Sequence, residues 1–294
     1  MKILLLGAKG QVGSEIVDLA RARQITVDAF DYDTLDITDR SQIQHTFEHC
    51  NNIDIVINAA AYTAVDQAEQ EKDKAFAVNA TAMRHLTEAC RAYNLPLLHL
   101  STDYVFDGES TQPYSEDDHP HPLSVYGKSK LAGEDFLRNG WEKHVIIRIS
   151  WVFGRYGKNF VKTMLRLAEE KEEFSVVGDQ HGCPTAAKDV AQVLLAVAKH
   201  IHQGRAHWGT YHYCNQPVTT WYEFAVKIIE LARKRRSLKV KQIKKITSAD
   251  YPVVVVRPKN SEMRVKKITD DYNIEQSEWL PFLEEIVHEI VEIE

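Results

Sequence analysis

Residues 3–13 read Ile3-Leu4-Leu5-Leu6-Gly7-Ala8-Lys9-Gly10-Gln11-Val12-Gly13, an apolar run followed directly by glycines at every third position. The apolar run predicts a buried first strand, and Val12, Ile16 and Leu19 recur at helical spacing. Glycines between a strand and a helix allow a tight turn and let backbone N–H groups approach a pyrophosphate. The spacing is G-x-x-G-x-x-G rather than G-x-G-x-x-G, and a plain glycine turn is the alternative. We predict a dinucleotide site that includes Gly7, Gly10, Gln11, Val12 and Gly13.

The rest of the first half alternates between strand-like and helix-like segments. Apolar runs at 25–30, 53–57, 95–100 and 145–149 predict further strands. Between them we expect a helix capped by Thr38 and a long, proline-free helix at Lys72–Tyr93. Apolar strands separated by helices predict a parallel sheet covered on both faces. With right-handed crossovers this is an α/β, doubly wound (Rossmann) fold, which binds its ligand beyond the carboxyl ends of the strands.

The second half is less regular and is rich in helices and polar loops. We expect helices at 159–171, 189–201, 220–236 and 283–293. No Gly/Ser/Pro-rich spacer separates the two halves, so a clean linker is not expected. We predict a dinucleotide-binding domain at residues 1–149. Residues 150–294 form mainly a smaller, mixed substrate-binding region, with some segments returning to the first domain.

Composition argues against several classes of function. The 36 basic and 42 acidic side chains leave a net charge of −6, which disfavours a nucleic-acid or anionic-membrane partner. The basic stretch at 233–245 is interpreted as a solvated helix end. No apolar run approaches the roughly 18–20 residues needed to span a bilayer. The four cysteines form no C-x-x-C, which indicates reduced thiols in a cytoplasmic protein. His119 and His121 alternate with prolines and predict an exposed loop rather than a metal site.

The stretch Tyr126-Gly127-Lys128-Ser129-Lys130 carries the chemistry. A spacing of four residues puts the phenol and the ammonium on one face of a helix. A nearby positive charge is expected to lower the pKa of the tyrosine, so that Tyr126 can exchange a proton with an alcohol or ketone oxygen. Chance supplies Tyr-x-x-x-Lys often, but here Thr102 ends a preceding apolar strand and can bind the same oxygen. A threonine that only caps a turn is the alternative.

Two further segments fit the predicted dinucleotide site. Asp31 follows the second strand, where a carboxylate accepts hydrogen bonds from a ribose, which favours NADH over NADPH. Lys9 in the glycine turn could offset that preference. Asp36 and Ile37 are expected beside the adenine. Small residues after the third strand let the backbone approach a ligand closely, in the segment that includes Ala61, Tyr62 and Thr63.

Together these motifs resemble the extended short-chain dehydrogenase/reductase superfamily, which works on nucleotide sugars. Within it, the chain is similar to the dTDP-4-dehydrorhamnose reductase family over nearly its whole length. The segments that carry the resemblance are 101–108 (STDYVFDG), 125–134 (VYGKSKLAGE), 149–152 (ISWV), 159–165 (NFVKTML), 179–185 (DQHGCPT) and 257–261 (RPKNS).

The resemblance implies reduction of dTDP-4-dehydro-L-rhamnose to dTDP-L-rhamnose, with NADPH or NADH as the cofactor. It implies that Thr102, Tyr126 and Lys130 are catalytic, and that Tyr126 and Lys130 also contact the cofactor. Thr102, Asp103, Tyr104 and Trp151 match positions expected at the sugar, and Arg257 and Asn260 are assigned to the nucleotide diphosphate. A homodimer is the expected assembly. Some members are described with Mg²⁺ near a subunit interface; Glu15 and Asp189 could serve here but are not diagnostic, and no metal ligand is assigned.

Three alternatives remain at this stage. A nucleotide-sugar dehydratase or epimerase is disfavoured because Asp103-Tyr104, and not Asp-Glu, follows Thr102. A reductase that makes a related 6-deoxysugar, such as the talose epimer, would share every motif. A non-catalytic regulatory subunit, similar to that of methionine adenosyltransferase, would not need the intact Thr102, Tyr126 and Lys130 set.

Overall fold

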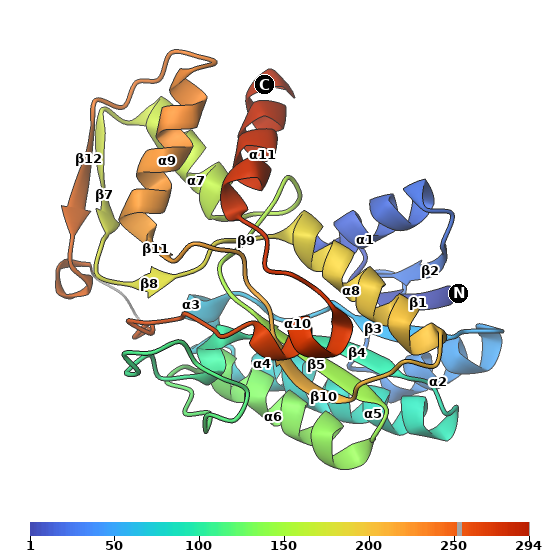
Figure 1. Ribbon diagram of the computed structural model, residues 1–294. Coiled ribbons are helices and arrows are strands. Elements are labelled where there is room, and N and C mark those ends of the chain that lie inside the picture. The colour runs from blue at the N-terminus through green and yellow to red at the C-terminus, as the bar shows by residue number, and fades with distance from the viewer. Residues whose placement is uncertain (252–254, 294) are drawn as a thin grey trace.

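The computed structural model describes residues 1–251 and 255–293. Its centre is a six-stranded parallel sheet with the strand order β10-β5-β4-β3-β1-β2 (Figure 1). The order reverses direction at β1, which is the mark of a doubly wound sheet and confirms the predicted fold class. The strands are β1 (Lys2–Leu6), β2 (Thr26–Phe30), β3 (Ile55–Asn58), β4 (Leu97–Thr102), β5 (His144–Ile149) and β10 (Gly209–His212).

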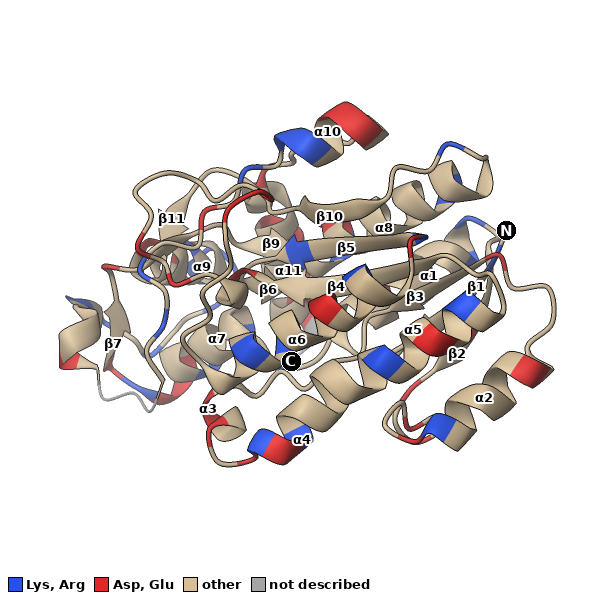
Figure 2. Ribbon diagram, turned by 90° about the horizontal axis from the view of Figure 1, so that it is seen from below, with Lys and Arg blue, Asp and Glu red and all other residues tan. Residues whose placement is uncertain are grey.

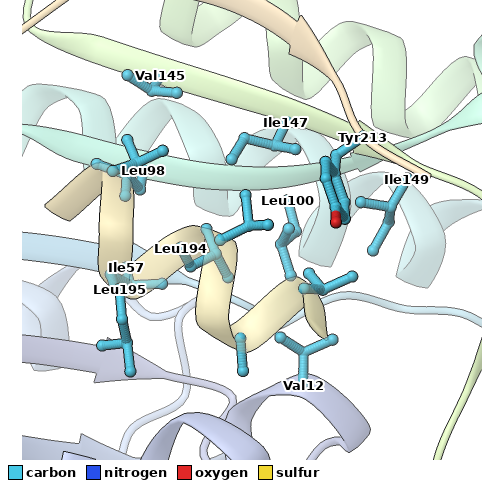
Figure 3. Close-up of a cluster of buried hydrophobic side chains, with 14 of the residues drawn as sticks. Val12, Ile57, Leu98, Leu100, Val145, Ile147, Ile149, Leu194, Leu195 and Tyr213 are labelled. Carbon is cyan, nitrogen blue, oxygen red and sulfur yellow. The ribbon is translucent and has the colours of Figure 1, made fainter. Parts of the chain in front are cut away.

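Helices cover both faces of this sheet because its strands are apolar on both sides. Leu98 and Leu100 of β4 point into a core under α1 (Gln11–Ala22) and α8 (Ala187–His202), together with Val145 and Ile147 of β5 (Figure 3). Alternate residues of the same strands, such as Leu97 and Ile146, pack on the opposite face. That face is covered by α2 (Arg40–His49), α5 (Ala82–Ala92) and α6 (Val125–Gly140).

The segment predicted as one helix at 72–93 is interrupted. It consists of α4 (Lys72–Phe76), a π-helical stretch η1 (Ala77–Thr81) and α5. The prediction that Thr38 caps the helix at 40–49 is wrong by one residue, because Asp39 accepts from the backbone N–H groups of Ser41 and Gln42. The short α3 (Val65–Ala68) precedes this segment, and the short 3₁₀ turn η2 (Asp103–Val105) follows β4.

Residues after 150 build a second core and also return to the first sheet. The second core packs α7 (Phe160–Glu170), α9 (Trp221–Arg233) and α11 (Trp279–Ile293) against β7 (Glu173–Val177), which pairs with β12 (Gln242–Ile246). Two short pairs connect this core to the cleft: β6 (Val152–Phe153) with β9 (Thr185–Ala186), and β8 (His181–Gly182) with β11 (Thr219–Thr220). Strand β10, helix α8 and the short α10 (Lys266–Tyr272) pack with the first sheet (Figure 1). A last 3₁₀ turn, η3 (Ser248–Asp250), follows β12.

Charged side chains are mixed rather than segregated. Acidic and basic positions alternate along α4 and α5 (Figure 2). In the basic stretch 233–245, Arg236 pairs with Glu169, Lys241 with Glu172, and Lys244 with Glu173. These ion pairs agree with the interpretation of the stretch as a solvated face. No helix in the described parts of the chain is long and apolar enough to cross a bilayer.

Candidate active site

A cleft of about 1110 Å³ lies at the carboxyl ends of the sheet strands. It is lined by the β1–α1 turn, the segments that follow β2, β3 and β4, the first turns of α6 and the segment before β6. The structure brings together there most residues predicted from the sequence: Gly7, Gly10, Gln11, Val12, Asp31, Asp36, Ile37, Ala61, Tyr62, Thr63, Thr102, Asp103, Tyr104, Tyr126, Lys130 and Trp151.

The glycine turn has the shape that a pyrophosphate requires. Gly7 has φ of +80°, and a Cβ there would lie 2.5 Å from the backbone N of Ala60. A Cβ on Gly13 would lie 2.0 Å from the Gly7 carbonyl oxygen, so Gly13 lets α1 pack tightly on the turn rather than lining the cleft. Gly10 caps α1 without a side-chain hydrogen bond, which leaves the first N–H groups of the helix available to an anion. The turn therefore fits a dinucleotide.

Asp31 lies directly after β2 and faces the same cleft. Its Oδ2 accepts from the backbone N of Lys9 at 2.7 Å, and its Oδ1 accepts from the backbone N of Tyr32 at 2.8 Å. The Lys9 ammonium lies beside Asp33 at 2.5 Å and is exposed. The Asp31 carboxylate therefore stands at the end of the cleft where a ribose is expected, while the nearby Lys9 ammonium is paired with a second carboxylate, Asp33.

Tyr126 lies in the first turn of α6. Ser124 caps the helix by accepting from the backbone N of Gly127 at 3.0 Å, and a Cβ on Gly127 would lie 2.2 Å from the Tyr104 carbonyl oxygen. This close approach seats the helix on η2 and brings the Tyr104 and Tyr126 rings edge to face, with centroids 5.7 Å apart. The expected fall in the tyrosine pKa is wrong for the free protein: burial raises the pKa of Tyr126 to about 12, and a hydrogen bond with Thr102 opposes that rise only in part.

Lys130 does not lower the pKa of Tyr126, because its side-chain nitrogen is directed toward β4. Nζ donates to the Leu100 carbonyl oxygen at 2.7 Å and lies 3.2 Å from Nε2 of His99. Burial lowers the pKa of Lys130 to about 8, against an opposing contribution from Glu134. His99 was not singled out from the sequence, since one histidine within an apolar strand gives no pattern.

Thr102 and Asp103 form the end of β4 beside Tyr126. The Thr102 hydroxyl accepts from the backbone N of Tyr104 at 3.2 Å and donates to Asp103 Oδ1 at 3.1 Å. Burial raises the pKa of Asp103 to about 6, although hydrogen bonds with Ser261 and Thr102 favour the carboxylate. Asp103 Oδ2 is buried without a hydrogen-bond partner among the described residues. Two polar groups are thus held next to the phenol.

Trp151 forms the opposite wall. Its φ is +46°, and its indole stacks on Trp221 with ring centroids 3.6 Å apart. The loop that follows docks on α1, where Asn159 donates to Gln11 Oε1 at 3.1 Å and Arg155 pairs with Glu15 and Asp18. Neither Trp221 nor Asn159 was predicted as a site residue, although Asn159 opens the 159–165 segment that carries the resemblance.

Arg257 and Asn260 are not among the residues that line the cleft. Arg257 donates to Asp66 Oδ2 at 3.2 Å, and Asn260 donates to the Ser110 carbonyl oxygen at 2.9 Å. Arg257 thus ties the late segment to α3, and Asn260 ties it to the loop that contains Ser110. Their assignment to a nucleotide diphosphate stays a prediction.

The acidic positions considered for Mg²⁺ have protein partners. Arg155 donates to Glu15 Oε1 at 3.1 Å, while Tyr213 and Asn215 both donate to Asp189 Oδ2 at 2.5 Å. Both carboxylates are therefore engaged in the internal structure. His121, from the proline-rich loop, lies 3.2 Å from Asp107.

Comparison with known proteins matches this arrangement to one family. The family model described as "RmlD substrate binding domain" matches residues 1–292. The dTDP-4-dehydrorhamnose reductase of Aggregatibacter actinomycetemcomitans is 42% identical over 97% of this chain and 98% of its own. That of Escherichia coli (strain K12) is 37% identical over 99% and 98%.

A solved structure agrees in three dimensions. The dTDP-4-dehydrorhamnose reductase of Bacillus anthracis, determined in complex with NADP, superimposes with a TM-score of 0.89 at 36% identity, covering 98% of this chain and 99% of that one. These matches extend over the sheet, the cleft and the second core alike. The chain therefore belongs to the dTDP-4-dehydrorhamnose reductase family of oxidoreductases.

Proposed function

We propose that this chain reduces the C4 ketone of dTDP-4-dehydro-L-rhamnose to give dTDP-L-rhamnose, with NADPH or NADH, and that Tyr126 donates the proton. The observation that carries the proposal is the convergence of Thr102, Tyr126 and Lys130 on the cleft that also contains the glycine turn. The substrate is inferred from relatives such as those of Aggregatibacter actinomycetemcomitans and Escherichia coli, which are 42% and 34% identical and are named dTDP-4-dehydrorhamnose reductase. The solved relative bound to NADP supports a nicotinamide cofactor.

Each residue of the site has its own role in this reaction. When bound, a reduced nicotinamide would supply the hydride. Tyr126 holds its proton firmly at neutral pH, since burial raises its pKa to about 12, and so it is poised to donate to an oxygen that becomes basic. Thr102 orients the same oxygen. A dehydratase would need a further acidic residue at position 104. Because this chain has Tyr104 there, simple reduction is favoured.

Replacing Tyr126 with phenylalanine tests the proton donor. Y126F removes only the hydroxyl, so we expect turnover to fall about 10²–10⁴-fold, the usual contribution of a general acid. Turnover is followed as oxidation of NADPH or NADH with the purified 4-keto sugar, and the product is identified by NMR. Affinity for the cofactor, measured by fluorescence titration, is expected to stay near that of the wild type.

The exposed Tyr93 at the end of α5 offers a matched control. Y93F makes the same chemical change outside the cleft and is expected to leave turnover unchanged. Unimpaired turnover in Y126F would exclude the assigned role. Failure of the wild type to oxidise either cofactor with this sugar would overturn the substrate assignment itself.

A further inference from the structure

The first turn of α6, which carries Tyr126, is held by side chains from two places in the chain. The Ser124 hydroxyl accepts from the backbone N of Gly127 at 3.0 Å. Glu69 Oε1 accepts from the backbone N of Val125 at 2.8 Å. The Ser124 bond holds a residue that follows Tyr126, whereas Glu69 holds the residue that precedes it. Tyr126 is therefore fixed from both sides along the helix.

The Val125 N–H needs this acceptor because it is shielded from water. Val125 is 9% exposed and Ser124 is 2% exposed. The first four N–H groups of a helix have no partner within the helix, and a donor that is buried without a partner destabilises the fold. Glu69 lies 56 positions earlier in the chain than Val125, so the bond is a tertiary contact and not a local cap.

Glu69 also supplies a charge that the helix itself lacks. The first turn of α6 contains no acidic residue. The positive end of the helix dipole lies at this turn and favours an anion there. Because the Glu69 carboxylate is bonded to the first N–H group of the helix, it fills the place that an acidic residue of the first turn usually takes.

The short helix α3 holds Glu69 beside α6. Glu69 directly follows α3, and Ala68 of that helix packs in one apolar cluster with Tyr126. A separate ion pair, between Asp66 of α3 and Arg257 at 3.2 Å, attaches the same helix to the late segment of the chain. Helix α3 is thus attached at two points, which fixes the position from which Glu69 reaches α6.

We propose that Glu69 is a positioning residue for Tyr126. By holding the Val125 N–H, its carboxylate fixes the first turn of α6 and keeps the phenol in place. The Tyr126 hydroxyl then stays beside Thr102, with which it forms a hydrogen bond. Glu69 is not among the residues that line the cleft, so it acts through the helix and not on the substrate. The inference rests on the role of Tyr126 proposed above.

Two substitutions of Glu69 separate the hydrogen bond from the charge. E69A removes the acceptor, and a misplacement of about 1 Å can cost about 10²-fold in rate, so we expect kcat to fall about 10- to 100-fold. KM for the cofactor should change less than kcat. E69Q keeps an oxygen at the same reach and loses only the interaction of the charge with the helix end, so its kcat should stay within about 5-fold of the wild type.

The control is E142A, at an exposed glutamate just beyond the other end of α6, which should turn over as the wild type does. A wild-type kcat in E69A, or an equal loss in E69Q and E69A, would overturn the proposal. If E69A does not fold, E69D replaces it. That variant keeps the charge but withdraws the oxygen by one methylene, and the same loss of kcat is expected.

NMR of the full-length protein tests the positioning without reference to activity. With the tyrosines labelled at ¹³Cζ, the signal that is absent from Y126F belongs to Tyr126. We expect this signal to move or broaden in E69A and to keep its wild-type position in E69Q and E142A. An unmoved signal in E69A would overturn the positioning role even if the enzyme reduces the sugar. A moved signal in a protein that does not reduce the sugar would support the positioning role and count against the proposed function alone.

Discussion

Trp151 occupies the left-handed region at φ +46°, a conformation that costs a bulky residue about 1–3 kcal/mol. Two neighbours hold it there. Trp221 stacks on one face of the indole, and Gly182 leaves the space for the other, since a Cβ on Gly182 would lie 2.5 Å from the ring. The strained side chain forms a wall of the cleft. Trp221 thus positions Trp151 without lining the cleft itself.

Removing the stack is expected to weaken sugar binding more than turnover. An aromatic pair contributes about 0.5–1.5 kcal/mol, so for W221L we expect KM for the 4-keto sugar to rise roughly 3- to 10-fold with a smaller change in kcat. W208F, at a more exposed tryptophan outside the cleft, is the control. A loss of kcat in W221L with an unchanged KM would show that Trp221 does not act through the wall of the cleft that Trp151 forms.

The charge state of the catalytic groups could not be predicted from the sequence. The Tyr126–Lys130 spacing correctly puts both residues on one helix that faces the cleft. It cannot show that Nζ turns toward Leu100 and His99, because those partners come from β4, about 30 residues earlier. The predicted fall in the Tyr126 pKa was therefore wrong, and burial dominates instead.

At the scale of elements, α6 is attached to the sheet by a buried ion pair. Arg148 on β5 donates to Glu134 from Nη2 at 2.7 Å and from Nε at 2.9 Å, and both side chains are almost fully buried. Burial is the largest single effect and would raise the pKa of Glu134, but Arg148, Ser101 and Arg138 together lower that pKa. The pair fixes the helix that carries Tyr126 and Lys130.

Breaking this pair from one side should be costly. R148M removes the buried partner of Glu134 and leaves only the partly exposed Arg138, so we expect the free energy of unfolding to fall by about 3–5 kcal/mol. Urea denaturation measures it. R138M is the matched control: Arg138 also contacts Glu134, at 3.0 Å, but is 37% exposed, so a loss of at most about 1 kcal/mol is expected. Equal losses in the two variants would contradict the role assigned to Arg148.

The elements themselves were predicted unevenly. Strands β1, β4 and β5 are mostly apolar, with polar residues such as His99 in β4 and Arg148 in β5, and such runs are the strongest signal of a buried parallel strand. Strand β10 was missed because Gly209–His212 is short and mostly polar. The π stretch within 72–92 was also missed. There Asn79 accepts from the backbone N of Tyr62 and donates to Ser129, and these tertiary contacts leave no periodicity in the sequence.

At the scale of the whole molecule, stability should depend on histidines that are buried uncharged. His212, on β10, is fully buried; burial and the nearby Arg148 lower its pKa to about 3. His99 is shifted in the same direction. An unfolded histidine binds a proton below about pH 6.5, whereas these two do not in the folded chain. Their contribution to the stability of the folded chain is complete above about pH 6.5 and is lost as the pH falls toward the pKa of the folded state.

Unfolding free energies at about pH 7.5 and 5.5 test this dependence. At one pH unit below the pKa of an unfolded histidine, each histidine that stays uncharged in the folded chain lowers the free energy of unfolding by about 1.4 kcal/mol. Asp103 opposes the loss, since its pKa is raised to about 6 and it gains a proton in the folded state over the same interval. We therefore expect a net fall in the wild type, and a fall about 1.4 kcal/mol smaller in H212Q. The exposed His119 gives the control H119Q, which should lose as much as the wild type. A wild-type protein equally stable at both pH values would show that these imidazoles do accept protons without unfolding.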